Sequence, residues 1–168
     1  LEEGTAVFEK ETELHSSEVF KSASLFFLGI GNTRRSNYAR AIQIFSKNLR
    51  VVKHTKEPQA LFYAYQGAAF FRFFKGQFRN ARKIAELAYK VAYQNDFIYG
   101  QVLSLDLLAH CNCQLGLYRR GVLEFERALE LANRIGNGGL CSALTISIAC
   151  YKAQAGFDFL QTESELLR

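Results

Sequence analysis

Apolar residues recur every three or four positions along most of this chain, and short polar or glycine-containing breaks divide them into segments. In residues 36–54, one helix face would carry Tyr38, Ala41, Ile42, Phe45, Leu49 and Val52. A period near 3.6 residues is that of an amphipathic α-helix. Pro58 is the one proline, so little interrupts helices, and runs of β-branched residues are short. The pattern predicts an all-α protein.

The breaks between segments place the ends of eight helices, which form four pairs. The predicted helices cover residues 16–35, 36–54, 58–75, 78–93, 97–115, 118–135, 140–155 and 159–167. Residues that suit helix N-caps stand at three of the starts: Ser16 or Ser17, Ser36, and the pair Asn95 and Asp96. Residues 1–14 combine a few apolar residues with many acids, and they form either a short helix or a frayed tail.

A unit of 40 residues repeats along the chain without insertion or deletion. Counted from residue 22, small residues recur at the eighth and twentieth positions of the unit: Gly29, Ala69, Ala109 and Ala149, then Ala41, Ala81 and Gly121. We expect two helices to cross closely there, because a larger side chain would push their axes apart. A fixed period of this size is typical of helical arrays.

Two further positions of the unit also have a physical reason. The fifteenth holds Ser36, Gly76, Gly116 and Gly156, which permit a tight turn between helices. The seventeenth holds Tyr38, Phe78 and Tyr118, and we expect each ring to fill the wedge between one hairpin and the next.

These positions, together with Phe at the twenty-fourth and Ala at the twenty-seventh, resemble the tetratricopeptide repeat (TPR). The resemblance implies a right-handed superhelix of about four helix hairpins, with repeats at about 22–61, 62–101, 102–141 and 142–168, preceded by an N-terminal segment or helix at 1–15. The fourth copy departs from the pattern, with Asp158, Gln161 and Glu165 at aromatic or small positions, and is expected to cap the array. The unit has 40 residues instead of the usual 34. In this length it resembles the repeats of bacterial regulatory and signalling proteins.

In TPR-like arrays the first helix of each pair lines a concave groove. The resemblance implies a groove lined by Phe26, Ile30, Thr33 and Arg34, then Tyr63, Gln66, Phe70, Phe73 and Phe74, then Asp106, His110, Cys113 and Gln114, and then Ile146 and Gln154. An apolar surface of this kind usually marks a contact site for a peptide or an amphipathic helix. Two other interpretations stay open: the rings are buried by tight curvature, or residues 1–14 fill the groove.

Asp106, His110 and Cys113 would lie on one stripe of one helix, and these residue types serve in nucleophilic and metal sites. Cys113 is near a helix C-terminus, however, where the helix dipole raises a thiol pKa, and no third His or Cys ligand is nearby. The glycine-rich stretches at 29–31 and 136–139 follow no strand, which weighs against a phosphate-binding loop. We expect no enzyme activity, no metal and no cofactor.

The formal net charge of +5 is concentrated in the first third of the chain. The basic residues there are Arg34, Arg35, Arg40, Lys47, Arg50, Lys53 and Lys56. They could form a basic edge for an acidic partner or a nucleic acid, but a solvated outer face is the simpler interpretation and weighs against nucleic acid. None of the four cysteines belongs to a Cys-x-x-Cys pair, and the sequence shows no signal peptide and no apolar stretch near 18 residues. We therefore expect a reduced, cytoplasmic protein with no membrane segment.

The sequence therefore predicts a scaffold or adaptor that binds another protein in its groove. The alternative is a peptide- or ligand-sensing arm of a larger bacterial signalling or transcription-regulatory protein, of which this chain would be a fragment. Homodimerisation through an apolar outer face is also left open.

Overall fold

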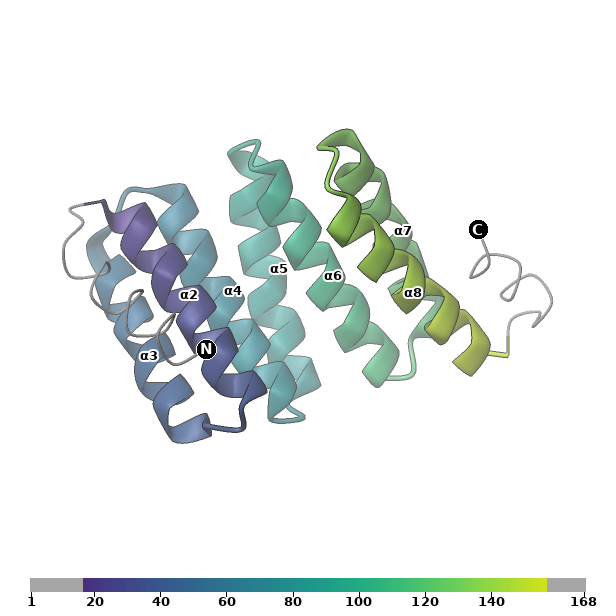
Figure 1. The fold of residues 1–168 in the computed structure, drawn as a ribbon, viewed down its shortest axis with the longest axis horizontal. Coiled ribbons are helices and arrows are strands. Elements are labelled where there is room, and N and C mark those ends of the chain that lie inside the picture. Colours follow the sequence, from purple (N-terminus) through teal and green to yellow (C-terminus); the bar gives the residue numbers. More distant parts are fainter. Residues whose placement is uncertain (1–16, 157–168) are drawn as a thin grey trace.

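The computed structural model describes residues 17–156, which form seven α-helices and one short 3-10 helix (Figure 1). The α-helices are α2 Glu18–Arg34, α3 Tyr38–Val51, α4 Pro58–Phe74, α5 Phe78–Gln94, α6 Ile98–Gln114, α7 Tyr118–Arg134 and α8 Gly138–Gln154, and the 3-10 helix is η1 Val52–His54. Within residues 17–156 there is no strand. The predicted helix 159–167 and the segment 1–15 lie outside the described residues.

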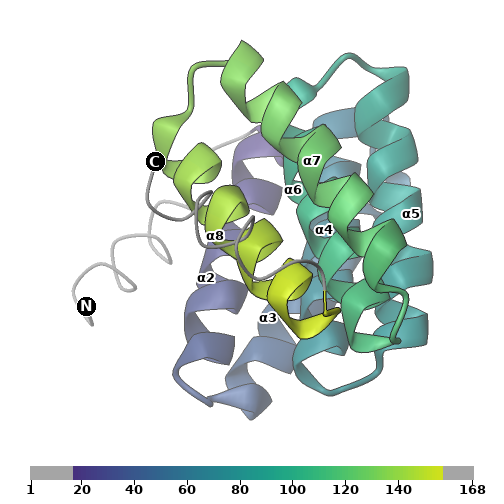
Figure 2. The same ribbon diagram turned by 90° about the vertical axis from the view of Figure 1, so that its right-hand side faces the viewer.

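Consecutive helices pack as antiparallel hairpins, α2–α3, α4–α5 and α6–α7, and α8 adds to α7. In Figure 1, α2, α6 and α8 lie toward the viewer, with α5 and α7 behind them. Figure 2 views the array from its α8 end and shows α6 and α8 beside α7. The helices form two layers, an inner one of α2, α4, α6 and α8 and an outer one of α3, α5 and α7. The prediction of an all-α superhelical array is confirmed.

The turns within hairpins follow the repeat. Ser36, Gly76, Gly116 and Gly156 have φ values of 61°, 71°, 79° and 71°, in the left-handed region that favours glycine. In the second hairpin, Gly76 N donates to Phe73 O at 2.9 Å, and Gln77 N donates to Arg72 O at 3.0 Å. These bonds satisfy carbonyls at the end of α4, as the fifteenth position of the repeat predicts.

Two of the three predicted N-caps are wrong. Ser17 does cap α2, accepting from Phe20 N at 3.4 Å. Ser36 does not cap α3, because it takes up the left-handed turn, and Asn37 accepts from Arg40 N instead. The residue before α6 is Phe97, which makes no capping hydrogen bond, while Asp96 has a φ of 52°.

The small positions of the repeat are buried where helices cross. Gly29, Ala69 and Ala109 are buried on the inner helices, and Ala41, Ala81 and Gly121 are buried on the outer ones. The seventeenth position behaves differently in the first copy, because the Tyr38 ring is 42% exposed and fills no wedge. Phe78 contacts Phe73 of its own hairpin, with ring centroids 5.3 Å apart.

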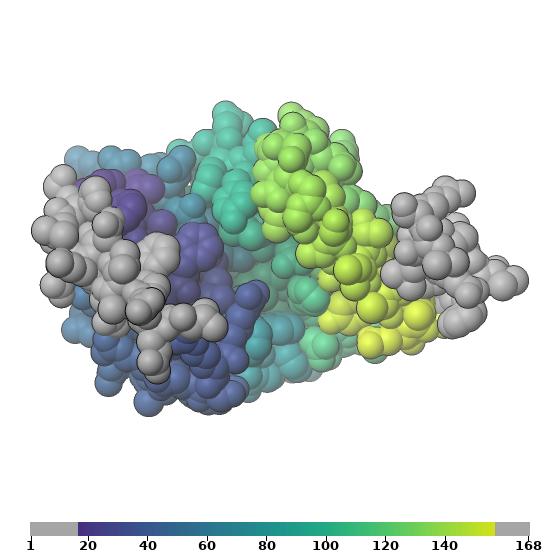
Figure 3. Space-filling view, viewed as in Figure 1, coloured from purple at the N-terminus to yellow at the C-terminus, as the bar shows by residue number. Residues whose placement is uncertain are grey.

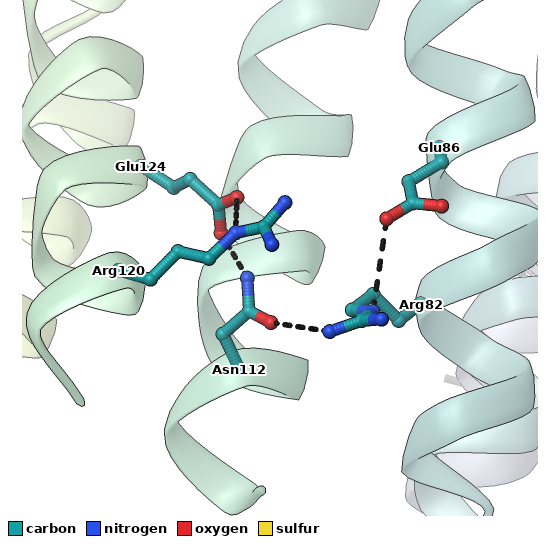
Figure 4. A network of polar contacts seen from close by, with 5 residues as sticks. All are labelled: Arg82, Glu86, Asn112, Arg120 and Glu124. Atoms are coloured by element: carbon teal, nitrogen blue, oxygen red, sulfur yellow. Dashed lines mark hydrogen bonds and ion pairs between the residues drawn. The ribbon is translucent and has the colours of Figure 1, made fainter. Parts of the chain in front are cut away.

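A polar network joins α5, α6 and α7 (Figure 4). Asn112 of α6, which is fully buried, donates from Nδ2 to Glu124 Oε2 at 2.6 Å and accepts from Arg82 Nη1 at 3.3 Å. Arg120 pairs with Glu124 at 3.4 Å, and Arg82 pairs with Glu86 at 3.6 Å. The network ties the second hairpin to the third.

Glycine replacement at two helix positions should have opposite effects on stability. A methyl group added at Gly121 would overlap Cys113 Sγ and would lie 2.9 Å from Ala109 O, which is backbone and cannot move aside. Gly121→Ala should therefore lower the free energy of unfolding by about 1–3 kcal/mol. At Gly31, inside α2, an added methyl meets nothing within 4 Å, so Gly31→Ala should raise it by about 0.5–1 kcal/mol.

Urea denaturation of the two variants, followed by circular dichroism, checks this pair. A Gly121→Ala variant as stable as the parent would mean that α6 and α7 cross less closely than the structure has them.

Candidate binding groove on the inner helices

The inner helices enclose a hollow on one face of the molecule. Figure 3 shows it between α2 on one side and α8 on the other, with a floor formed by the middle of the chain. The helices α2, α4, α6 and α8 carry the predicted groove residues. Their individual positions differ from the prediction in several places.

A row of aromatic side chains follows α4. Phe70 lies seven residues after Tyr63, and Phe73 and Phe74 follow Phe70 by three and four residues. Ring centroids are 4.6 Å apart for Phe70 and Phe74, and 5.8 Å apart for Phe73 and Phe74. Phe74 is 42% exposed, and the other three rings are half-buried. The rings are thus neither fully buried by curvature nor isolated from one another.

The first copy contributes Phe27 to this row instead of Phe26. Phe26 is only 3% exposed and packs against Tyr63 at a centroid distance of 5.6 Å, so its place among the groove-lining residues is wrong. Phe27 is 46% exposed, and its ring lies 6.3 Å from that of Tyr63. The two residues are neighbours in sequence and point about 100° apart on the helix, so a small error in phase exchanges them. We call Phe27, Tyr63, Phe70, Phe73 and Phe74 the aromatic row.

A polar cluster lies at the α6 end of the aromatic row. The ring of His110 is 5.9 Å from that of Phe73. His110 Nε2 is 3.5 Å from Asp106 Oδ1, and His110 Nδ1 is 3.1 Å from the hydroxyl of Tyr151. Gln114 also donates to that hydroxyl, at 3.3 Å. The predicted residues Asp106, His110 and Gln114 are therefore brought together.

Tyr151 of α8 is a member of this cluster that the sequence did not reveal. Gly31, Phe71 and Cys111 occupy the same repeat position in the other copies. Since this position is not among those that line the groove, the repeat pattern did not predict a role for Tyr151 there. Burial raises the pKa of its hydroxyl, and the hydrogen bond from Gln114 opposes that shift. Burial at the floor of the hollow also raises the pKa of Asp106, and nearby His110 opposes this.

Two predicted groove residues belong to the core instead. Gln66 is buried, where its amide donates to Leu103 O at 2.8 Å and its carbonyl accepts from Ser104 at 3.3 Å. These bonds join α4 to α6. Cys113 is buried with its thiol against Gly121 of α7, and burial, followed by the charge of Glu124, raises its pKa to about 11. The expected stripe of Asp106, His110 and Cys113 in the groove is therefore wrong.

Of the remaining predicted residues, Thr33 is buried and the others are half-buried or exposed. Ile30 is half-buried, and Arg34 is exposed in the last turn of α2. Thr33 is buried and bonds Gly29 O of its own helix at 2.9 Å. Ile146 and Gln154 of α8 are exposed. Arg34, Phe74, Gln114 and Gln154 share the thirteenth position of the repeat and stand near the C-terminal ends of the inner helices.

Residues 17–156 contain no candidate metal site and no candidate membrane span. No group of three or more His, Cys, Asp or Glu side chains in this range is placed to hold a metal ion. None of the helices in the same range is both long enough and apolar enough to cross a membrane.

The sequence matches no protein-family model and no curated protein. Among solved structures, the chain is similar to BtubC (BKLC) from P. vanneervenii, with a TM-score of 0.76 at 16% identity over 98% of this chain and 70% of that chain. It is also similar to a Signal Transduction ATPase with Numerous Domains from Pyrococcus horikoshii that has a tetratricopeptide repeat sensor. That likeness has a TM-score of 0.68 at 20% identity, over 94% of this chain and 24% of that chain. At these identities the likenesses establish a helical-repeat fold.

Proposed function

We propose that this chain is a TPR-like protein-interaction module that binds a peptide or an amphipathic helix of another protein along its inner groove. The observation that carries the proposal is the aromatic row, whose rings meet in two groups, Phe27 with Tyr63 and Phe74 with Phe70 and Phe73. Phe27 and Phe74 are exposed to solvent. When a partner covers exposed aromatic surface, that surface is removed from water, and this lowers the free energy of the complex. Aromatic side chains also dominate binding energy at protein interfaces.

The polar cluster would fix the direction of the bound segment. Apolar side chains spaced by three or four residues on a partner helix would pack on the aromatic row. The side chain of Asp106 is 38% exposed and can accept a hydrogen bond from the partner, and Arg34 can pair with an acidic group at the α2 rim. Asp106 lies on α6 and Arg34 lies on α2, so the two groups contact different parts of the bound peptide. A peptide bound in the reverse direction would lose both contacts.

Selection of peptides tests the groove while the partner is still unidentified. Peptides selected from a random library on the immobilised chain should carry spaced apolar residues. The double variant Phe27→Ala/Phe74→Ala should weaken their binding at least tenfold, which corresponds to about 1.4 kcal/mol. These two rings are better targets than Phe70 and Phe73, since Phe73 also packs on Phe78 and His110.

The matched control replaces two exposed leucines of the outer helices, Leu87→Ala/Leu123→Ala, and should leave the affinity unchanged. Circular dichroism should show unchanged helix content for both variants. Peptides that bind the groove variant as tightly as the parent would refute the groove as the site.

A sensing arm is the second candidate function. It is favoured by the structural likeness to a chain whose name includes a tetratricopeptide repeat sensor, of which the matched part is about a quarter. The domains encoded by the full-length gene distinguish the sensing arm from the adaptor. An attached nucleotide-binding or output domain would favour the sensing arm. A gene that encodes little beyond the array would favour the adaptor.

A further inference from the structure

A second concave surface lies between α3 and α4, separate from the inner groove. It is a cleft of about 290 Å³ lined by Ile42, Phe45 and Leu49 from α3 and by Ala68 and Phe71 from α4, with Lys75 at its edge. We call it the α3–α4 cleft. Because α3 and α4 both pack against α2, the cleft opens on the side that faces away from α2.

The cleft exposes apolar side chains in a regular arrangement. Ile42 is 40% exposed and Leu49 is 41% exposed. They are seven residues apart on α3, which places them two turns apart on one face of the helix, about 10 Å along its axis. Phe71 faces them from α4, and its ring lies 5.8 Å from that of Phe45, which forms the floor.

The repeat itself provides the comparison that marks this cleft as special. Forty positions after Ile42 is Arg82, which bonds Asn112 of α6 in the polar network of Figure 4. Forty positions after Phe71 is Cys111, which is fully buried. Correspondingly, in its contact with the preceding hairpin, α6 packs more on α5 than on α4, whereas α4 packs more on α2 than on α3. The second hairpin therefore closes the junction that the first hairpin leaves open and apolar.

The charge around the cleft is strongly positive. Residues 19–85 contain thirteen Lys and Arg and a single acid, Glu57, whereas residues 86–156 contain six of each kind. The Lys75 ammonium lies 5.2 Å from the centre of the Phe71 ring, directly on the cleft wall. Arg72 also lines the cleft, so two cations at the end of α4 stand at its edge. An apolar floor with a basic edge is complementary to a helix with one apolar face and acidic flanks.

We propose that the α3–α4 cleft is a second docking site, which takes an acidic amphipathic helix of a partner protein. Apolar side chains of that helix, spaced by three, four and seven residues, pack against Ile42, Leu49 and Phe71. Its Asp and Glu residues pair with Lys75 and Arg72. A nucleic acid fits less well, because phosphate binding needs the basic edge but gains nothing from an apolar floor.

Fluorescence anisotropy with synthetic helical peptides tests this site on the intact chain. The probe is a labelled 18-residue peptide with Leu on one face and Glu on both flanks, and its partner probe has Lys at every Glu position. We expect the acidic peptide to bind at least tenfold tighter than the basic one, with an affinity that falls as salt is added. Equal binding of the two peptides would overturn the proposal.

Variants then locate the peptide. Ile42→Ser/Leu49→Ser should weaken binding of the acidic peptide at least tenfold, and Lys75→Gln/Arg72→Gln should weaken it and flatten the salt dependence. The matched control Leu87→Ser/Leu123→Ser, on the other outer helices, should leave it unchanged. The groove variant Phe27→Ala/Phe74→Ala should also leave it unchanged, so this site and the proposed function can fail separately. Unchanged binding by the Ile42/Leu49 variant would overturn the site.

Three further results would assign the cleft to another occupant and overturn the proposal. A concentration-dependent dimer in analytical ultracentrifugation that Ile42→Ser/Leu49→Ser dissociates would assign it to a second copy of the chain. Peptide affinity that rises more than tenfold when residues 1–16 are deleted would assign it to that acidic segment of the chain itself. Binding of duplex DNA that the charge variant abolishes and the acidic peptide cannot displace would assign the surface to nucleic acid.

Discussion

Replacing Phe125 by alanine is expected to lower the free energy of unfolding by about 3–5 kcal/mol, because the ring is fully buried where α6, α7 and α8 meet. The ring of His110 stands at 87° to it at a centroid distance of 4.9 Å, and the ring of Tyr151 stacks on it at 5.7 Å. Alanine would leave a cavity behind both residues of the polar cluster. Urea denaturation followed by circular dichroism measures the loss.

Phe27→Ala provides the matched control for this prediction. The same side chain is removed from a helix of the same array, but the ring is 46% exposed, so the loss should stay below about 1 kcal/mol. Comparable losses for the two variants would contradict the packing around Phe125. A folded Phe125→Ala variant should also bind groove peptides more weakly, because His110 loses the ring that holds it in place.

Much of the fold could be predicted from the sequence because its determinants are local. The turns at Gly76, Gly116 and Gly156 follow from the left-handed conformation that glycine tolerates and from a strict 40-residue register. The close crossings follow from small residues such as Ala81 and Ala109 at fixed positions. Both signals lie within one or two turns of helix, so they can be used without the tertiary structure.

The N-caps were harder to predict because adjacent residues compete for the same role. Ser36 and Asn37 both suit an N-cap, and the choice depends on which of them takes the left-handed turn. Before α6, the left-handed residue is Asp96, and the cap position falls on Phe97, which has no capping oxygen. The residue types alone do not decide between such arrangements.

The groove could be predicted in outline but not residue by residue. Phe70, Phe74, Asp106 and His110 lie where the repeat register places them, but Phe26, Gln66 and Cys113 are turned into the core. The reason is contact with other helices: Gln66 bonds Leu103 O of α6, and Cys113 faces Gly121 of α7. The α3–α4 cleft depends on the distance between two helices, which no sequence period encodes.

Replacing Asn112 by alanine is expected to lower the free energy of unfolding by about 2–3 kcal/mol. The side chain is fully buried, and it connects Arg82 of α5 with Glu124 of α7 through hydrogen bonds of 3.3 and 2.6 Å. Without it, Glu124, whose side chain is only 12% exposed, keeps Arg120 at 3.4 Å but loses its shorter bond. Hydrogen bonds to a poorly solvated charge are costly to leave unmade. Chemical denaturation of the variant measures the loss.

The repeat supplies the matched control, because Asn32 occupies the same position in the first hairpin. Asn32 is nearly as buried, but its amide donates only to Leu28 O of its own helix, at 2.9 Å, so Asn32→Ala should cost no more than about 1 kcal/mol. Equal losses at the two positions would show that burial of an asparagine matters and the network does not. A larger loss at Asn112 alone would mean that its bonds to Arg82 and Glu124, which join the second hairpin to the third, stabilise the array beyond the burial of the side chain.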